Sequence, residues 1–254
     1  MTIARVLAIA GSDSGGGAGI QADIRTITML GGHAMTAVTA ITAQNTQGVQ
    51  AAMPVPAEMV IAQIRSVADD IGVDAVKIGM IGSAATAHAV ADWLGTMPGV
   101  PVVFDPVMIA TSGATLADAA TIAAFGRLMR RATVTTPNLP ELAALGGEDA
   151  VRAQGGAVLV KGGHGAGDRV EDRLIATDGT QSRWSEARIP TRHTHGTGCT
   201  LASGIATGLA QGLTLTAAVE RAIGFVRAAL AHAPGLGAGH GPMGHAMGRV
   251  PYDA

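Results

Sequence analysis

The chain has 254 residues, a length that suits one α/β domain. Apolar residues make up 48 % of it and aromatic residues only 2 %, so aliphatic side chains must fill the core. A formal net charge of −2 argues against a general nucleic-acid-binding protein. The single cysteine, the missing signal peptide and the lack of an uninterrupted apolar stretch of roughly 20 residues lead us to expect a soluble cytoplasmic protein with no membrane partner.

Apolar runs alternate with helical patterns along the chain. Strands are predicted at residues 6–10, 35–41, 75–78, 100–104, 133–135 and 157–160. Helices are predicted at residues 19–30, 57–71, 84–94, 116–131, 140–145, 200–212 and 215–232. This order predicts an α/β fold in which helices cover both faces of a mostly parallel central sheet.

We expect one domain over residues 1–254, since no linker or repeat interrupts the pattern. Residues 169–189 alternate like an antiparallel hairpin at the edge of the sheet. The tail from about residue 234 is rich in Gly, Pro and His and is predicted to be irregular. Ligands of such sheets bind beyond the carboxyl ends of the strands, so the loops after the strands should carry the site.

A glycine-rich loop at residues 11–19 follows the first strand and leads into a helix. Five of its nine residues are glycine, more than a tight β–α turn requires, although such a turn is the simplest alternative. A P-loop is excluded because the chain contains no Gly-Lys pair. Gly17-x-Gly19-x-x-Ala22 has the form of a dinucleotide fingerprint, but no acid lies between Asp23 and Glu58 to bind a ribose.

A second glycine-rich loop, His195-Gly196-Thr197-Gly198-Cys199-Thr200, precedes a helix predicted to begin near Leu201. The backbone N–H groups around Gly196 and Gly198 would form an anion hole at the start of that helix. The positive end of the helix is expected to lower the pKa of Cys199. The alternative is that Cys199 is a small buried packing residue.

Only two lysines accompany fifteen arginines, and both lie at the ends of predicted strands. Lys77 and Lys161 are therefore candidate phosphate contacts, although chance could place them there. Asp105 follows another strand, and Asn138 and Glu141 lie three residues apart after a further one. Their oxygens suit Mg²⁺, while the alternative for Asn138 and Glu141 is a helix cap with a capping box.

His193 and His195 flank Thr194 and could suggest a zinc site, but no third ligand is evident in the sequence.

Taken together, several motifs resemble the hydroxymethylpyrimidine/phosphomethylpyrimidine kinase family. They lie at residues 8–23, 43–49, 77–80, 105–108, 136–141, 160–164, 194–200 and 239–242. The resemblance runs from about residue 5 to 242 and implies a three-layer α/β/α ribokinase-like fold that uses ATP and Mg²⁺. It also implies transfer of the γ-phosphoryl group to a pyrimidine alcohol in thiamine biosynthesis and, in many members, to the resulting monophosphate.

The resemblance also implies roles for single residues. Gln44 would recognise the edge of the pyrimidine ring, and its amide offers both a donor and an acceptor. Gly11 and Asp23 would lie around the ring and Met80 would pack on it, while Thr42 stands where an aliphatic residue is common. Cys199 takes the position of the catalytic base of most ribokinase-like kinases.

On the phosphate side, Lys161 would meet the ATP phosphates, and Asp105 and Glu141 would serve the metal directly or through water. Gly196 and Gly198 would hold the transferring group. Further contacts to ATP are expected from Thr194, Thr197 and Asn138. One departure from the family motif is His193, which stands where asparagine is usual.

A pyridoxal or pyridoxine kinase of the same fold is the main alternative. A sugar kinase would be expected to carry Asp at the position of Cys199. A nucleotide-binding regulator without catalysis would keep both glycine-rich loops. The sequence leaves open a homodimer, the preferred nucleotide and the occurrence of the second phosphorylation.

Overall fold

The computed structural model describes residues 3–110, 113–163, 165 and 167–248. Its strands are β1 (Arg5–Asp13), β2 (His33–Asn45), β3 (Gly48–Pro54), β4 (Ala75–Ile78), β5 (Val102–Phe104), β6 (Val134–Thr135), β7 (Ala157–Val160), β8 (Arg169–Ile175) and β9 (Gln181–Ala187). Its helices are α1 (Gly19–Met29), α2 (Ala57–Asp70), α3 (Ala84–Leu94), α4 (Ala119–Met129), α5 (Leu139–Ala144), α6 (Glu148–Arg152), α7 (Thr197–Ala210) and α8 (Leu215–Ala231). His164, which belongs to one of the motifs above, lies outside the described residues. No described helix combines the length and the apolar character needed to cross a membrane.

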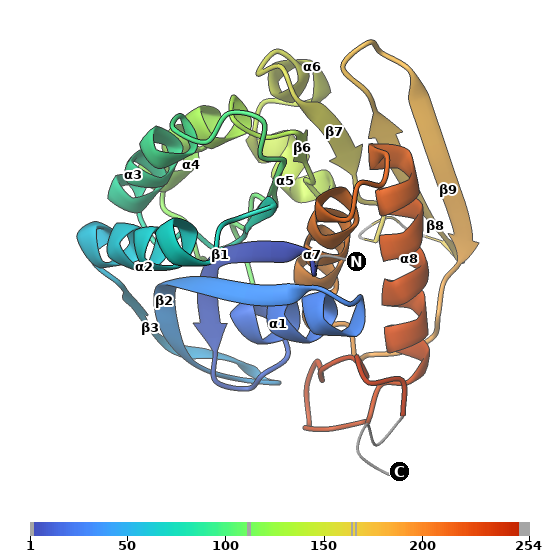
Figure 1. Cartoon of the computed structure of the whole chain (residues 1–254). Coiled ribbons are helices and arrows are strands. Elements are labelled where there is room, and N and C mark those ends of the chain that lie inside the picture. The colour runs from blue at the N-terminus through green and yellow to red at the C-terminus, as the bar shows by residue number, and fades with distance from the viewer. Residues whose placement is uncertain (1–2, 111–112, 164, 166, 249–254) are drawn as a thin grey trace.

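The strands of the described chain join one sheet in the order β3-β2-β1-β4-β5-β6-β7-β8-β9 (Figure 1). Pairing is parallel from β2 through β1, β4, β5 and β6 to β7. The outer strands β3, β8 and β9 pair antiparallel with their neighbours. The carboxyl ends of the parallel strands therefore share one edge, where their loops come together.

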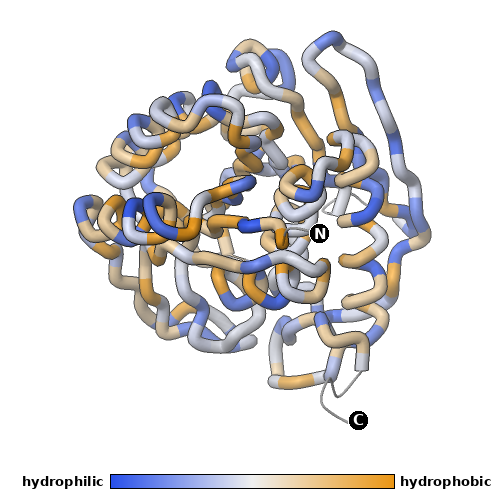
Figure 2. Tube along the Cα trace, viewed as in Figure 1, coloured by the Kyte–Doolittle hydropathy of each residue, from blue (hydrophilic) through white to orange (hydrophobic). Residues whose placement is uncertain are grey.

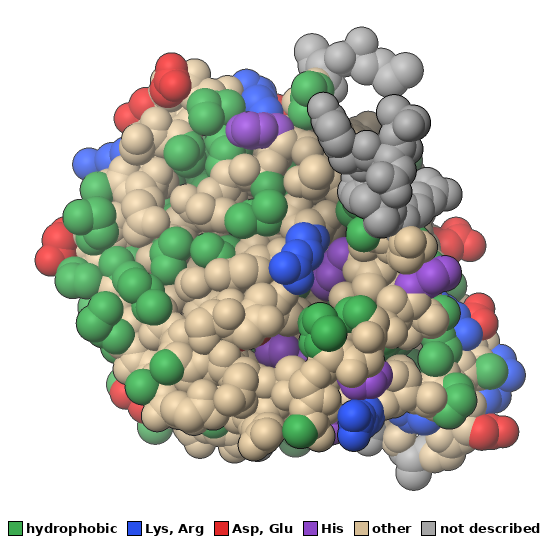
Figure 3. Space-filling model, turned by 90° about the horizontal axis from the view of Figure 1, so that it is seen from below, with side chains coloured by type: hydrophobic (Ala, Val, Ile, Leu, Met, Phe, Trp, Pro, Cys, Tyr) green, Lys and Arg blue, Asp and Glu red, His purple; other side chains and the backbone are tan. Residues whose placement is uncertain are grey.

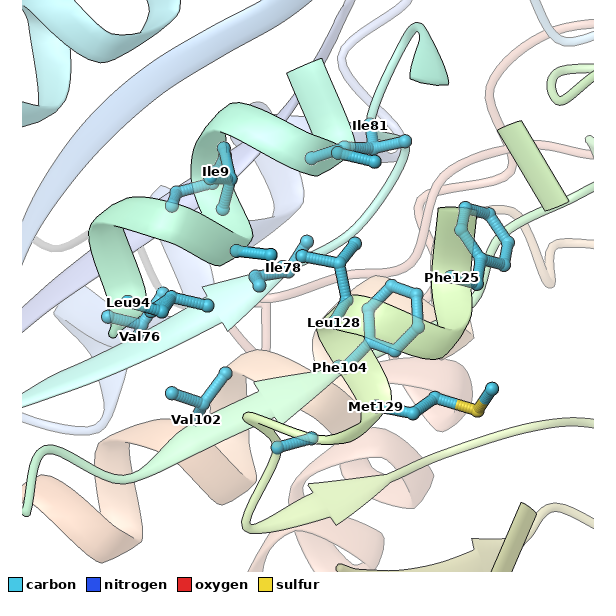
Figure 4. Close-up of a cluster of buried hydrophobic side chains, with 14 of the residues drawn as sticks. Ile9, Val76, Ile78, Ile81, Leu94, Val102, Phe104, Phe125, Leu128 and Met129 are labelled. Atoms are coloured by element: carbon cyan, nitrogen blue, oxygen red, sulfur yellow. The ribbon is translucent and has the colours of Figure 1, made fainter. Parts of the chain in front are cut away.

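Successive residues of the buried strands face opposite layers, as the pleat requires. In β1, Leu7 and Ile9 pack with residues of α2, α3 and α4, whereas Val6 and Ala8 pack with residues of α1, α7 and α8. In the first of these two layers, Phe104 of β5 meets Phe125 of α4 edge to face, with ring centroids 5.2 Å apart (Figure 4). Hydrophilic residues concentrate on the outer turns of the helices (Figure 2).

This arrangement confirms the predicted three-layer α/β/α fold with its mostly parallel sheet. The predicted hairpin at 169–189 is present as β8 and β9. Strand β3 and the short helix α6 were not predicted, and β2 extends to Asn45, beyond the predicted end of the strand. Helix α7 begins at Thr197, so the prediction that it starts near Leu201 is wrong.

The helices differ in how they begin. The side chains of Ser83, Asp118, Asn138 and Thr214 cap α3, α4, α5 and α8 by accepting a hydrogen bond from the first turn. Helices α1 and α7, which follow the two glycine-rich loops, begin without a side-chain cap. Helices α2 and α6 also lack such a cap, so a missing cap alone does not mark a ligand-binding helix end.

Candidate active site

A cavity of about 830 Å³ opens at the carboxyl edge of the parallel strands. It is lined by both glycine-rich loops, by turns that follow several strands, by the β8–β9 hairpin and by α8. The predicted site residues that line it are Gly11, Thr42, Gln44, Met80, Asp105, Asn138, Glu141, Lys161, Thr194, Gly196, Thr197, Gly198 and Cys199. The structure thus brings together residues from the whole length of the chain.

Asp13 organises the first glycine-rich loop. Its Oδ1 accepts a hydrogen bond of 2.8 Å from the N–H of Gly15, and its Oδ2 accepts bonds of 2.9 Å from Gly17 and Ala18. Burial raises the pKa of Asp13, but the hydrogen bonds from His195 and Ala18 outweigh it and hold this pKa below its ordinary value. The loop is therefore fixed around a buried carboxylate before any ligand arrives.

His195 connects the two loops. Its Nε2 lies 2.8 Å from Oδ2 of Asp13 and 3.3 Å from Nε2 of Gln44. Oγ1 of Thr42 lies 3.1 Å from Oε1 of Gln44 and 2.9 Å from the carbonyl oxygen of Ser12. Thr42 and His195 thus flank the amide of Gln44, while Nε2–H of His195 is donated to the carboxylate of Asp13. The sequence analysis placed His195 in the second glycine-rich loop and considered it as half of a metal pair, but it did not predict the contact with Asp13.

The turn before and at the start of α7 is shaped by two glycines. Gly196 has φ of 89°, and a Cβ there would lie 1.9 Å from the carbonyl oxygen of Gly17. Both the conformation and the contact between the two loops therefore require glycine. A Cβ on Gly198 would lie 3.2 Å from Oδ2 of Asp105 and 3.4 Å from Nζ of Lys161. The first turn of α7 consequently lies against the charged groups of the cavity.

Lys161 lies between two carboxylates. Its Nζ is 2.6 Å from Oδ1 of Asp105 and 3.7 Å from Oε2 of Glu141, while Thr136 donates a 2.9 Å hydrogen bond to the same oxygen of Asp105. Burial lowers the pKa of Lys161, but the carboxylates of Asp105 and Glu141 raise it above its ordinary value. The lysine is therefore charged at neutral pH and is partly exposed to the cavity.

Asn138 and Glu141 form a capping box at the start of α5. Asn138 donates its backbone N–H to Glu141 at 2.8 Å, and its side chain accepts the N–H of Glu141 at 2.9 Å. The capping alternative is therefore confirmed. Both residues also line the cavity, so the cap leaves their predicted ligand roles possible.

The predicted lowering of the pKa of Cys199 is wrong. Burial raises the pKa of this thiol to about 11, although the nearby Lys77 lowers it. The carboxylates of Asp23 and Asp105 raise it further. The loss of water around the sulfur is the largest effect on this pKa, so Cys199 lines the cavity as a neutral thiol.

Asp23 does not line the cavity, and its predicted contact with a substrate is wrong. Its carboxylate is fully buried and accepts bonds of 2.8 and 2.9 Å from Nζ of Lys77 and one of 2.8 Å from Oγ of Ser203. The suggestion that Lys77 meets phosphate is wrong for the same reason. Lys77 alternates with Val76 and Ile78 in β4, so its side chain faces the opposite layer, toward α1 and α7.

Comparison with known proteins decides the family of this chain. The profile of a family described as phosphomethylpyrimidine kinase matches residues 13–244. The chain belongs to this family.

Individual relatives agree with the family match. A hydroxymethylpyrimidine/phosphomethylpyrimidine kinase of Streptomyces coelicolor is 49 % identical, over 94 % of this chain and 93 % of its own length. The thiamine biosynthesis multifunctional protein ThiED of Corynebacterium glutamicum is 43 % identical over 95 % of this chain, which spans only 34 % of that longer protein. A solved structure of Bacillus subtilis pyridoxal kinase with ADP superimposes with a TM-score of 0.88 at 31 % identity, covering 97 % of this chain and 98 % of that one. The predicted family and the ribokinase-like fold are therefore confirmed.

A phosphomethylpyrimidine kinase needs a phosphate donor, and membership of a kinase family implies ATP. The chemistry of the cavity also fits Mg²⁺, because this ion prefers one or two carboxylates together with phosphate oxygens and water. Asp105 and Glu141 supply such oxygens, yet Lys161 already lies against both of them. Within the described ranges, no group of three or more His, Cys, Asp or Glu residues could hold a metal by itself. The donor set thus fits an ion shared with phosphate better than a site made of protein alone.

The sequence did not reveal one part of this phosphomethylpyrimidine kinase cavity. Apolar side chains from the β8–β9 hairpin, from the segment after it and from α8 line its far end, namely Trp184, Ile189, Ile223, Val226 and Leu230. Arg188 and Arg227 lie among them. No short motif marks these positions, because they meet only when the hairpin and α8 pack side by side.

Proposed function

We propose that the protein transfers the γ-phosphoryl group of ATP to the hydroxymethyl group of 4-amino-5-hydroxymethyl-2-methylpyrimidine, and then to the monophosphate so formed, in thiamine diphosphate biosynthesis. One observation carries the proposal: the amide of Gln44 and the first turn of α7 line one cavity. An amide that can read a ring edge and a helix start that can hold a phosphoryl group are the two elements that this reaction needs. The cavity volume of about 830 Å³ suits two small ligands.

The acceptor is recognised in this proposal by Gln44. The pyrimidine offers an amino group as donor and ring nitrogens as acceptors, and the amide complements both. Thr42 bonds to the amide and the ring of His195 lies beside it, which limits its motion and lowers the entropy lost on binding. Met80 packs beside Gly11, where a Cβ would come within 2.9 Å of its sulfur, so the thioether can cover one face of the ring.

In this proposal the phosphoryl group lies between Lys161 and the N-terminal turn of α7 while it is transferred from ATP to the acceptor. Phosphoryl transfer depends mainly on positioning and on neutralising charge, and both are supported by the geometry here. Lys161 supplies a fixed positive charge, and Gly196 and Gly198 let the backbone N–H groups approach the phosphate. Thr194, Thr197 and Asn138 add polar groups to the same wall of the cavity. Mg²⁺ bound near Asp105 and Glu141 would neutralise further phosphate charge.

The acceptor hydroxyl lies beside Cys199 in this scheme. A thiol with a pKa of about 11 is protonated at neutral pH and is a poor general base. In a loose transition state the attacking oxygen needs little help with its proton. Cys199 therefore positions the hydroxyl, whose proton passes to an oxygen of the transferred phosphoryl group or to solvent, and the transfer does not depend on a thiolate.

Pyridoxal phosphorylation is the second candidate function. The close structural match to a pyridoxal kinase favours it, because the two ring alcohols are of similar size. Relatives of higher sequence identity are named as pyrimidine kinases, which is why the pyrimidine is preferred here. The two activities share the donor side of the cavity and differ in what Gln44 must bind.

The test is a coupled assay that follows ADP release from Mg·ATP with a panel of hydroxymethyl heterocycles. The pyrimidine should give the highest kcat/KM, and its monophosphate should also be consumed. Gln44→Leu should lose most kcat/KM for the pyrimidine, whereas Gln47→Leu, which changes an exposed amide in the turn after β2, should not. A higher kcat/KM for pyridoxal, or equal activity of both variants, would overturn the proposal.

A further inference from the structure

The segment at residues 234–248, which follows α8, returns to the active site. Figure 3 views the molecule from the side on which this segment lies; histidines appear across this face, and acidic side chains lie around its edge. The N–H of Gly239 donates a 3.2 Å hydrogen bond to Oγ1 of Thr46, in the turn that follows Gln44. The carbonyl oxygen of Gly241 accepts a 3.3 Å bond from the N–H of His195. The segment thus contacts both the turn that follows Gln44 and the second glycine-rich loop.

Three glycines show how closely the segment is packed. A Cβ on Gly239 would lie 2.0 Å from the carbonyl oxygen of Thr46, and one on Gly244 would lie 1.9 Å from that of His232. On Gly241 it would lie 2.3 Å from Nδ1 of His193. Each of these contacts forbids any side chain. The segment is therefore irregular, as predicted, but it follows a course that the rest of the fold defines.

His245 lies at the end of this course. Its Nε2 is 2.8 Å from Oγ1 of Thr200, and the exposed fractions of the two residues are 3 % and 0 %. The ring of Phe225 in α8 lies at 6.3 Å from that of His245, and Gly244 donates its N–H to the carbonyl of Ala229 at 2.9 Å. Thr200 belongs to the first turn of α7, directly after Cys199. A buried hydrogen bond between a histidine and this turn restrains its position.

Resting on the function proposed above, we propose that His245 is a positioning residue for phosphoryl transfer. It fixes the first turn of α7, while residues 239–241 tie the second glycine-rich loop, which leads into that turn, to the turn that follows β2 and its Gln44. The amide that binds the pyrimidine and the helix turn that binds the phosphoryl group are thereby held at a fixed separation. Small displacements of reacting groups are costly in rate, so this restraint acts on turnover more than on affinity.

The test compares the wild type with His245→Ala and with His245→Gln, whose amide can renew the bond to Thr200. His245→Ala should lower kcat about tenfold or more, with KM values for pyrimidine and ATP within about threefold of wild type. His245→Gln should restore most of kcat. His232→Ala serves as the control, because that exposed ring bonds only to its own helix among the described residues and should change nothing.

A second measurement does not depend on activity. Cys199 is the only cysteine of the chain, so its rate of alkylation reports the order of the first turn of α7. His245→Ala should raise that rate several-fold at a temperature well below its Tm, and His245→Gln should not. If His245→Ala does not fold, Thr200→Val takes its place. That variant removes the same bond from its other side and should likewise raise the alkylation rate.

An unchanged kcat and alkylation rate in His245→Ala or Thr200→Val would overturn the inference, as would equal losses in His245→Ala and His245→Gln. A wild type without pyrimidine kinase activity would instead defeat the proposed function, while the alkylation rates would still decide whether His245 orders the turn.

Discussion

Whether Cys199 acts as a general base decides how the proton of the acceptor hydroxyl is handled. Because its thiol is neutral, Cys199→Ala should keep kcat within about tenfold of wild type, whereas loss of a general base typically costs about 100-fold or more. Gly198→Ala, one residue earlier, should cost roughly 100-fold, because its methyl group would crowd Asp105 and Lys161 where the phosphate must lie. Steady-state kinetics of both variants measure the difference.

The pH dependence of kcat gives an independent check on Cys199. Without a thiolate in the mechanism, the wild type should show no rise of kcat attributable to a thiol between about pH 7 and 9, where an ordinary cysteine ionises. A loss of kcat larger than about 100-fold in Cys199→Ala, together with such a rise, would show that the cysteine acts as a base after all.

His245 should make the free energy of unfolding depend on pH in the acid range. Burial, with a smaller effect of Arg25, lowers the pKa of this imidazole from 6.5 to about 4. Between these values the unfolded chain binds a proton that the folded chain does not, so stability should fall as the pH drops from about 6.5 to 4. The loss should reach about 3 kcal/mol at most. Urea unfolding across this range should show a shallower decline for His245→Gln than for the wild type.

Sequence patterns could identify the charged and nucleophilic residues near the site, but not their protonation states or their contacts. Asp23, Lys77 and Cys199 all stand in recognisable motifs, yet their protonation and contacts depend on burial that arises when α1, β4 and α7 pack together. The capping alternative for Asn138, which depends on backbone geometry, was correct from local pattern alone. The difference is that the local chain determines a turn or a cap, whereas a pKa depends on the whole surrounding layer.

At the scale of elements, one buried ion pair joins three of them. Asp23 of α1 bonds to Lys77 of β4 and to Ser203 of α7, and both charges are fully buried. The helices that follow the two glycine-rich loops are thus tied to the same strand. Burial raises the pKa of Asp23, while Lys77 opposes that rise. The pair is expected to be costly to form and more costly to break.

Asp23→Asn should therefore destabilise the protein by about 3–5 kcal/mol, because it leaves the ammonium of Lys77 buried without a counter-charge. Adding Lys77→Met to that variant should recover part of the loss, since no charge then remains buried. Unfolding midpoints in urea measure both effects. If the double variant is as unstable as the sum of the two single ones, the ion pair is not the source of the coupling.

The elements that were not predicted share a physical reason. Most of β3 is exposed, so it lacks the buried apolar run that reveals the central strands. Helix α6 has only five residues, too few for a helical period to emerge. Helix α7 starts with Thr197-Gly198-Cys199, where glycine lowers helix propensity. There the packing of two loops outweighs propensity, which is common where a helix start binds a ligand.

Across the whole molecule, the sheet topology was sufficient to predict where the chemistry gathers. Loops that follow parallel strands had to meet at one edge, and thirteen predicted site residues line the cavity there, whereas Asp23 and Lys77 do not. The apolar end around Trp184 and the return of residues 234–248 could not be predicted, because they depend on how the β8–β9 hairpin and α8 close the far side. Such contacts leave no periodic trace in the sequence.

Because segments from both ends of the chain line one cavity, we expect the chain to unfold cooperatively. If residues 1–254 fold as one domain, calorimetry should show a single unfolding transition, because the cavity is lined by residues from early in the chain to the C-terminal segment. A ligand at about 100 times its Kd adds about 2.7 kcal/mol of stability, which should raise Tm by about 5–10 °C. The pyrimidine and a non-hydrolysable ATP analogue should each move the whole transition. Gln44→Leu should abolish only the shift caused by the pyrimidine, whereas two transitions of which one alone responds would mean that the halves of the cavity belong to separately folding units.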